Sequence, residues 1–242
     1  MSDIRVGIVC EGKTDFYLIS KIVQLHFANP VVVTLLQPEL SEINSCGPLG
    51  GGWGGVYKWC RSIAKQSSNS QLPLMNHDLI IIHLDADVTE CNYEDYGISP
   101  SEYQSFRQLP ANFTCPPPSN AANYLAAALI QWLGKNDLPN SWVVCIPSKS
   151  IEAWVVACKY SDAFLHDDSL LECNKRLENW LAQRPIQDGD RFIKSGKKHA
   201  KTYRNFADKM TQEDWNKIQD ICIQAKQFQR ELSATTVCST FP

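Results

Sequence analysis

The stretch DLIIIHLDADVTE, residues 78–90, decides the expected fold, because a mostly apolar run leads directly into Asp85 and Asp87. An apolar run of this kind indicates a strand buried on both faces, as in a parallel sheet. A second stretch, IRVGIVCEGKTD at residues 4–15, repeats the pattern with an apolar run that ends in Glu11. We therefore expect three carboxylates at the carboxyl edge of one sheet, where open α/β sheets bind their ligands.

These carboxylates predict a site for a divalent metal ion. Carboxylates placed together repel one another and resist ionisation unless a cation joins them. Hard oxygen ligands suit Mg²⁺ or Mn²⁺ better than zinc. The chain has ten cysteines but no C-x-x-C pair, so the spacing of ligands for structural zinc is missing. The pattern indicates metal-dependent chemistry, with phosphate as the expected substrate group.

The composition is typical of a soluble globular protein. The 242 residues are 44% hydrophobic and 10% aromatic, enough for one large domain or a core domain with an appendage. The net charge of −3 hides an asymmetry, because the excess of acids lies in residues 1–140 and the excess of bases in 141–242. We find neither a cleavable signal nor an apolar run of about 20 residues that could span a bilayer. We therefore expect a cytoplasmic protein with reduced thiols and no membrane partner.

The order of apolar runs and helical patterns predicts a mainly parallel α/β sheet flanked by helices. Strands are expected at 4–10, 30–36, 77–84 and 141–147, and helices at 14–27, 56–66 and 120–133. This core is expected to occupy residues 1–160, with a loop-rich insertion at 88–118. A helical C-terminal region over 161–242 is expected to pack on the core.

Two expected helices have start signals. Thr14 is a plausible N-cap for the first helix, and Asp15 in its first turn suits the helix dipole without any chemical role. Thr211 and Asp214 form a capping-box-like pair that opens the last helix. One continuous apolar face then runs from Trp215 to Leu232, which predicts a single long helix.

The two acidic motifs resemble those of the Toprim domain of topoisomerases, DnaG-type primases and OLD-family nucleases. The resemblance covers roughly residues 4–155 and is closest to small stand-alone bacterial Toprim-like proteins. It implies that Glu11 acts as general acid/base or metal ligand and that Asp85 and Asp87 bind Mg²⁺. Several such proteins are effectors of anti-phage defence beside an ABC-type ATPase. Because this chain has no ATPase motif, such a partner would be a separate protein.

Two residues after the fourth strand have alternative interpretations. Glu152, in an Ile-Glu-Ala-Trp segment that the resemblance also includes, is either an acid favoured by a helix dipole or a fourth carboxylate. In the second case it would complete a two-metal site, as in phosphoryl-transfer enzymes. Lys149 either stabilises charge developing on a phosphate or is a solvated loop lysine.

A glycine-rich segment and a basic run are candidate phosphate-binding elements. In LGGGWGG, residues 49–55, the amides of Gly51 and Gly52 at the start of a helix carrying Lys58 could approach an anion. Trp53 could stack on a base, although the segment also fits a mobile connection and is not a Walker A motif.

The basic run, residues 191–204, has no acid within it and would contact a phosphodiester backbone unless it is only a solvated face. Two aromatic side chains, Phe192 and Tyr203, are interleaved with its bases. The bases are Arg191, Lys194, Lys197, Lys198, Lys201 and Arg204.

Three functions fit these patterns. The first is a Toprim-type nuclease that uses Mg²⁺ or Mn²⁺ to cleave DNA or RNA, alone, as a homodimer or with a partner. The second is a haloacid-dehalogenase-like phosphatase, in which Asp85 is the nucleophile and Asp87 the acid/base of a D-x-D-x-T motif. That motif normally follows the first strand of its fold, and this interpretation leaves Glu11 unexplained. The third is a non-catalytic Toprim-like module that binds a protein or nucleic acid.

Overall fold

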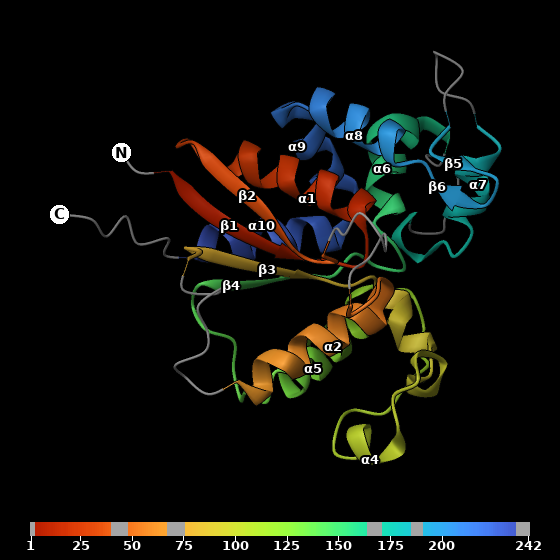
Figure 1. The fold of residues 1–242 in the computed structure, drawn as a ribbon. Helices are drawn as coiled ribbons and strands as arrows, with labels where there is room; N and C mark the ends of the chain where they lie inside the picture. Colours follow the sequence, from red (N-terminus) through yellow and green to blue (C-terminus); the bar gives the residue numbers. More distant parts are fainter. Residues whose placement is uncertain (1–2, 40–47, 67–75, 164–170, 185–190, 236–242) are drawn as a thin grey trace.

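The computed structural model describes residues 3–39, 48–66, 76–163, 171–184 and 191–235. Its centre is a four-stranded, entirely parallel sheet with the strand order β2-β1-β3-β4 (Figure 1). The four strands are β1 (Ile4–Val9), β2 (Val31–Gln37), β3 (Leu79–His83) and β4 (Trp142–Cys145). The predicted α/β fold with a parallel sheet is therefore confirmed.

Helices cover both faces of the sheet and continue into the C-terminal part of the chain (Figure 1). None of the helices in the described ranges is long and apolar enough to cross a membrane. The α-helices of the described part are α1 (Lys13–His26), α2 (Gly52–Lys65), α4 (Pro100–Tyr103), α5 (Ser119–Trp132), α6 (Glu152–Tyr160), α7 (Leu177–Ala182), α8 (Ala200–Lys209), α9 (Gln212–Ile221) and α10 (Ile223–Ala234). Short 3₁₀ helices are η2 (Ala86–Glu90), η3 (Tyr93–Tyr96), η4 (Ser161–Ala163) and η5 (Leu171–Cys173).

The sheet separates two hydrophobic cores. Successive side chains of a strand point to opposite faces, and β3 is buried on both. Leu79 and Ile81 pack with α1, α6 and the C-terminal helices, whereas Ile80 and Ile82 pack with α2 and α5. The C-terminal helices therefore share a core with the sheet, as expected for a region that packs on it.

The C-terminal region differs from the expected helical region in two ways. A small antiparallel hairpin, β5 (Ile193–Lys194) and β6 (Lys197–Lys198), lies within the basic run. The last helical pattern is divided at Cys222 into α9 and α10, although Trp215 and Leu232 are both buried as predicted. The division has a tertiary cause, because the buried Glu172 carboxylate accepts the N–H groups that open α10.

The predicted helix starts have mixed outcomes. Thr211 and Asp214 form a complete capping box at α9, as expected. Thr14 is not an N-cap, because α1 begins at Lys13 after Gly12, and the Thr14 hydroxyl donates to Asp15 instead. The glycine-rich segment also joins a helix earlier than predicted, since α2 begins at Gly52.

The segment expected as a loop-rich insertion, residues 88–118, contains only short helices, and its Tyr93 and Leu109 side chains are buried in the core formed by α2 and α5. A disulfide joins Cys115 of this segment to Cys173 in the C-terminal region. The expectation that all thiols are reduced is therefore wrong for this pair, because folding brings together cysteines that are 58 residues apart. The other cysteines in the described ranges are free: Cys10, Cys60, Cys91, Cys145, Cys158 and Cys222.

We expect Trp154→Ala to lower the free energy of unfolding by about 3–5 kcal/mol, the usual cost of removing a buried aromatic side chain. Trp154 is 1% exposed and packs against Trp215 and Phe228, so it joins α6 to the C-terminal helices. Urea denaturation followed by circular dichroism measures the change. The matched control is Ile223→Ala, at a side chain that is 48% exposed, with an expected change within about 0.5 kcal/mol. Equal effects of the two substitutions would contradict this packing.

Candidate metal centre at the carboxyl edge of the sheet

The ends of β1 and β3 bring the predicted acidic residues together. The two strands are direct neighbours in parallel register, with Val9 opposite Ile82, so the residues that follow them lie at one edge. The Asp85 backbone N–H donates to Glu11 Oε1 at 2.8 Å. The first predicted acid therefore touches the segment that carries the other two.

The loop after β4 closes the site from the other side. The Ile151 N–H donates to Asp85 Oδ1 at 2.9 Å, and the backbone of Asp87 donates to the Lys149 carbonyl at 3.3 Å. Asp85 is buried, whereas Asp87 is exposed at the start of η2. The carboxylates of Glu11 and Asp85 are thus held by backbone N–H groups of adjoining segments, whereas Asp87 is held through its backbone.

Crowding of these acids disfavours their ionisation. Burial and the charge of Asp85 raise the pKa of Glu11 well above its ordinary value. Partial burial of its carboxyl group and the charge of Asp85 raise the pKa of Asp87 to about 7, although part of its side chain reaches solvent. These perturbed carboxyl groups lie at a sheet edge, as expected for a functional site.

Two further titratable residues belong to the site and were not predicted. Asp15 is 3% exposed, so it is not a simple helix-start acid, and burial raises its pKa. The fully buried His83 has Nε2 3.4 Å from Asp85 Oδ1. Burial opposes charge on this ring, but Asp85 and Asp15 outweigh it and raise the pKa of His83. A histidine inside an apolar strand, and an acid one helical turn after Glu11, were the available signals.

Glu152 and Lys198 form an internal ion pair, which corrects two predictions. Lys198 Nζ lies 2.9 Å from Glu152 Oε1 and donates to Oε2 at 3.0 Å, and the Tyr203 hydroxyl donates to Oε1 at 2.6 Å. Glu152 is fully buried and both of its oxygens are engaged by Lys198 and Tyr203, so in this structure it is paired within the protein and is not a free fourth carboxylate. Lys198 is likewise not a surface cation for a phosphodiester backbone.

Lys198 also approaches two other acids of the site. Its Nζ lies 3.8 Å from Asp15 Oδ1 and 3.4 Å from Glu178 Oε1. Burial opposes the charge of the ammonium group, but Glu152 and Asp15 outweigh it and raise the pKa of Lys198 well above its ordinary value. Lys198 is therefore a permanent positive charge beside the acidic residues.

Lys149 is not a solvated loop lysine, because its side chain is mostly buried and its ammonium group is paired with Glu90. Only 7% of its side chain is exposed, and its Nζ donates to Glu90 Oε1 at 2.6 Å. Its backbone has φ of 60°, a left-handed conformation that is uncommon outside glycine. This places Lys149 beside Asp87, on the wall of a neighbouring cavity.

The glycine-rich segment packs more tightly than a mobile connection would. Gly52 donates its N–H to the Glu11 carbonyl at 2.8 Å, so the start of α2 adjoins the acidic edge. A Cβ atom on Gly54 would come within 1.9 Å of the Tyr96 ring, which explains the glycine there. Trp53 is 2% exposed and is therefore not a platform for a base. Gly51 is partly exposed and Lys58 is exposed, so both stay candidates for anion contact.

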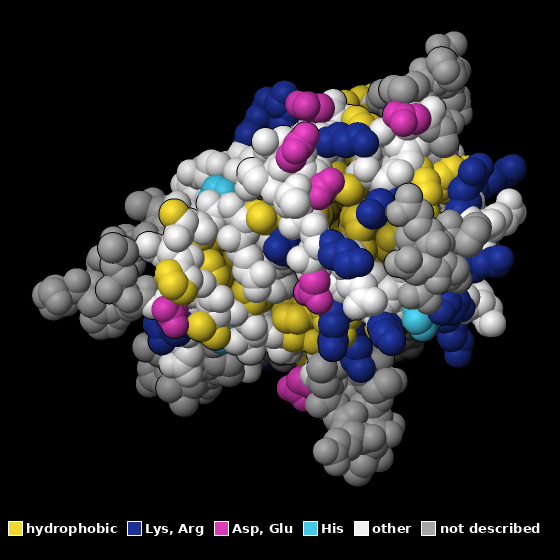
Figure 2. All heavy atoms as spheres, turned by 90° about the horizontal axis from the view of Figure 1, so that it is seen from above, with side chains coloured by type: hydrophobic (Ala, Val, Ile, Leu, Met, Phe, Trp, Pro, Cys, Tyr) yellow, Lys and Arg dark blue, Asp and Glu magenta, His cyan; other side chains and the backbone are white. Residues whose placement is uncertain are grey.

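The basic run is divided between surface and core. Lys194, Lys197 and Lys201 are exposed, and Figure 2 shows Lys and Arg side chains on the side of the molecule that carries α7, β5 and β6. The interleaved aromatics are not base-stacking groups, because Phe192 and Tyr203 are buried against each other with ring centroids 5.1 Å apart.

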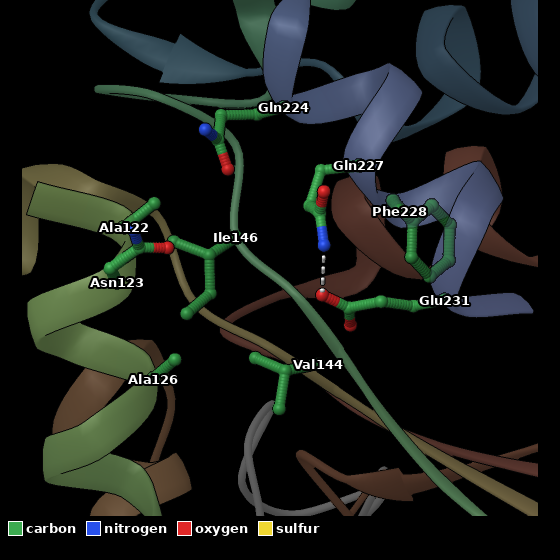
Figure 3. Close-up of a pocket in the computed structure, with 9 residues that line it drawn as sticks. All are labelled: Ala122, Asn123, Ala126, Val144, Ile146, Gln224, Gln227, Phe228 and Glu231. Carbon is green, nitrogen blue, oxygen red and sulfur yellow. Dashed lines mark hydrogen bonds between the residues drawn. The ribbon is translucent and has the colours of Figure 1, made fainter. Parts of the chain in front are cut away.

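A separate hollow between α5 and α10 does not contribute to the acidic site. It encloses about 40 Å³ beside Val144 of β4, and its α10 wall carries Phe228 and a hydrogen bond from Gln227 to Glu231 (Figure 3). Because one water molecule has a share of roughly 30 Å³ in the liquid, this hollow is too small for an organic substrate.

The donor chemistry of the edge fits a hard divalent cation, since Glu11, Asp85 and Asp87 supply only oxygen ligands. The pKa values of Glu11 and Asp87 are raised because both groups are buried near other carboxylates, and a bound cation would stabilise their ionised forms. In the described ranges, however, no three His, Cys, Asp or Glu side chains are already arranged to hold a metal ion. Comparison with protein-family models, curated proteins and solved structures finds no match.

We expect the thermal stability of the protein to fall as the pH rises through about 7, in part because of Asp87. The ordinary pKa of its carboxyl group is 3.8 and the folded value is about 7. The folded state thus retains a proton that the unfolded state loses, so this contribution is complete below pH 4 and lost above pH 7. Asp87→Asn should show a smaller fall in Tm between pH 5 and pH 8.

Asp208→Asn, at an exposed aspartate on α8, is the control and should behave as the unsubstituted protein does. If Asp87→Asn and Asp208→Asn gave the same pH dependence of Tm, the crowding of Asp87 would be refuted.

We expect Lys198→Met to destabilise the fold by about 3–5 kcal/mol, because it leaves the carboxylate of Glu152 buried without a cation. Adding Glu152→Gln should recover much of the loss, since an amide keeps an acceptor for Tyr203 and carries no charge. Denaturant unfolding of the single and double variants measures both effects. Lys201→Met, at an exposed lysine, is the matched control. Failure of the second substitution to restore stability would refute the ion pair as the cause.

Proposed function

We propose that this protein is a Toprim-type enzyme that uses Mg²⁺ or Mn²⁺ to cleave phosphodiester bonds in nucleic acid. The observation that carries the proposal is the hydrogen bond from the Asp85 backbone to Glu11 Oε1. It joins the acids of two neighbouring strands at the edge where parallel α/β sheets bind ligands. A phosphatase that used only Asp85 and Asp87 would have no need of this third carboxyl group.

The three acids differ in the roles that their surroundings favour. Asp85 and Asp87 are the main candidates to hold the cation, which would polarise a phosphate oxygen when bound. Glu11 is the candidate general acid/base, because burial and the charge of Asp85 raise its pKa well above the ordinary value of a glutamate. Glu11 can also serve as a ligand after losing that proton.

The position of Lys198 favours one metal ion over two. A two-metal enzyme places a second cation among its carboxylates to stabilise the charge of the substrate. Here the ammonium group of Lys198 lies against Glu152, Asp15 and Glu178. We infer that Lys198 supplies the second positive charge and that Glu152 holds it in place.

Exposed lysines of the basic run would bind the nucleic-acid backbone. Lys194, Lys197 and Lys201 lie on the same part of the chain as Lys198, which links this surface to the acidic edge. Such contacts are independent of sequence and weaken with salt. Cytoplasmic anti-phage defence beside a separate ABC-type ATPase, and assembly as a homodimer, belong to the proposal through the Toprim resemblance.

We expect the purified protein to cleave labelled DNA or RNA in the presence of Mn²⁺, and Asp85→Ala to lose at least about 100-fold of that activity. Glu11→Gln should lose activity as well, because the amide cannot exchange a proton. Asp208→Ala is the control, at an exposed acid outside the site. Gel analysis of time courses on both polymers measures cleavage.

Titration with Mn²⁺ should give one tight site per chain, and two equivalent sites would contradict the role given to Lys198. Hydrolysis of p-nitrophenyl phosphate that Asp85→Asn abolishes, without cleavage of any polynucleotide, would replace the proposal with a phosphatase. If neither reaction occurred with candidate partners added, a binding module would be the better interpretation.

A further inference from the structure

A cavity of about 260 Å³ opens beside the acids of the strand ends and shares Asp87 with them. It is formed by three segments that are far apart in the sequence, one from η2, one from the loop after β4 and one from the start of α7. Its lining residues are Asp87, Glu90, Lys149, Ser150, Asn174, Lys175, Glu178 and Asn179.

Two lysines converge on Glu90 in this cavity. Lys149 Nζ donates to Oε1 at 2.6 Å, and Lys175 Nζ donates to Oε2 at 2.8 Å. Both lysines lower the pKa of Glu90, although burial acts in the opposite direction. An ammonium group has three N–H donors, so each lysine keeps donors beyond its bond to Glu90. Glu90 thus holds two cationic groups side by side.

The walls of the cavity are fixed by contacts outside it. The Cys115–Cys173 disulfide lies directly before Asn174 and Lys175, so it restrains that wall. In the loop after β4, Lys149 has a left-handed backbone conformation, and its carbonyl group accepts a hydrogen bond from the N–H of Asp87. A strained residue retained in a cavity wall is a recognised sign of a binding function.

The charge of the cavity depends on whether a cation is present at Asp87. Three acids and two lysines line it, so the lining residues sum to a formal charge of −1, which Lys198 beside Glu178 offsets in part. A divalent cation held by Asp87 would change that charge to +1. Lys149 and Lys175 could then donate hydrogen bonds to an anion beside the cation.

We propose that this cavity binds the phosphoryl group of a terminal nucleotide, and that it does so only after a divalent cation has bound. The inference rests on the proposed function and specifies its substrate as a chain end. The volume equals that of about eight or nine water molecules at roughly 30 Å³ each. This space suits a phosphate with its sugar but not a length of duplex.

Isothermal titration calorimetry with inorganic phosphate tests the site without cleavage. We expect binding in Mg²⁺, no detectable binding in EDTA, and about tenfold weaker binding by Lys175→Gln in Mg²⁺, since one charge-assisted hydrogen bond is lost. Lys175 is 63% exposed, so the substitution preserves the fold. Lys226→Gln is the matched control on the surface of α10. Equal binding by the two variants, or binding in EDTA, would overturn the proposal.

A second titration identifies the source of the phosphoryl group. An oligonucleotide with terminal phosphates should bind about tenfold more tightly than the same strand with hydroxyl ends, and Lys175→Gln should remove the difference. Equal binding of the two strands would overturn the assignment to a chain end. If the protein binds phosphate through Lys175 but cleaves no nucleic acid, the phosphate site is supported and the proposed nuclease activity is refuted. An active enzyme without such binding would refute the cavity alone.

Discussion

Carboxylates crowd at one edge of the parallel sheet, and the contacts of the surrounding segments compensate for their charge. Adjacent β1 and β3 end at the same edge, so Glu11 and Asp85 meet through a backbone hydrogen bond. Like charges at this distance are costly unless they are protonated or joined by cations. The raised pKa values of Glu11 and Asp87 favour their protonated forms, and the ammonium group of Lys198 adds a positive charge beside the acids.

The C-terminal region is part of the site because it supplies the compensating cation. Lys198 enters from the β5–β6 hairpin and pairs with Glu152 at the start of α6. Tyr203 on α8 donates to the same carboxylate. A hydrophobic core shared by the sheet and the C-terminal helices fixes the relative positions of these elements. The acidic edge and the helical region therefore form one electrostatic unit.

Sequence patterns predicted the features that local chemistry controls. The four strands, the buried face from Trp215 to Leu232 and the Thr211–Asp214 capping box follow from periodicity and capping, and all are present. Side-chain environments were harder to predict. Lysines in one basic run look equivalent in sequence, yet Lys198 lies against buried acids while Lys197 is exposed. Trp53 likewise resembled a surface aromatic but is buried.

The positions of carboxylates after two buried strands could be predicted from the sequence, because an apolar run ending in an acid is a local pattern. The cations that meet those acids, and the side chains that line a cavity, could be identified only in the folded chain. Glu152 and Lys198 are 46 residues apart and Glu90 and Lys175 are 85 apart. Such pairs depend on how distant segments pack, and the packing is driven by apolar burial that specifies no particular ion pair.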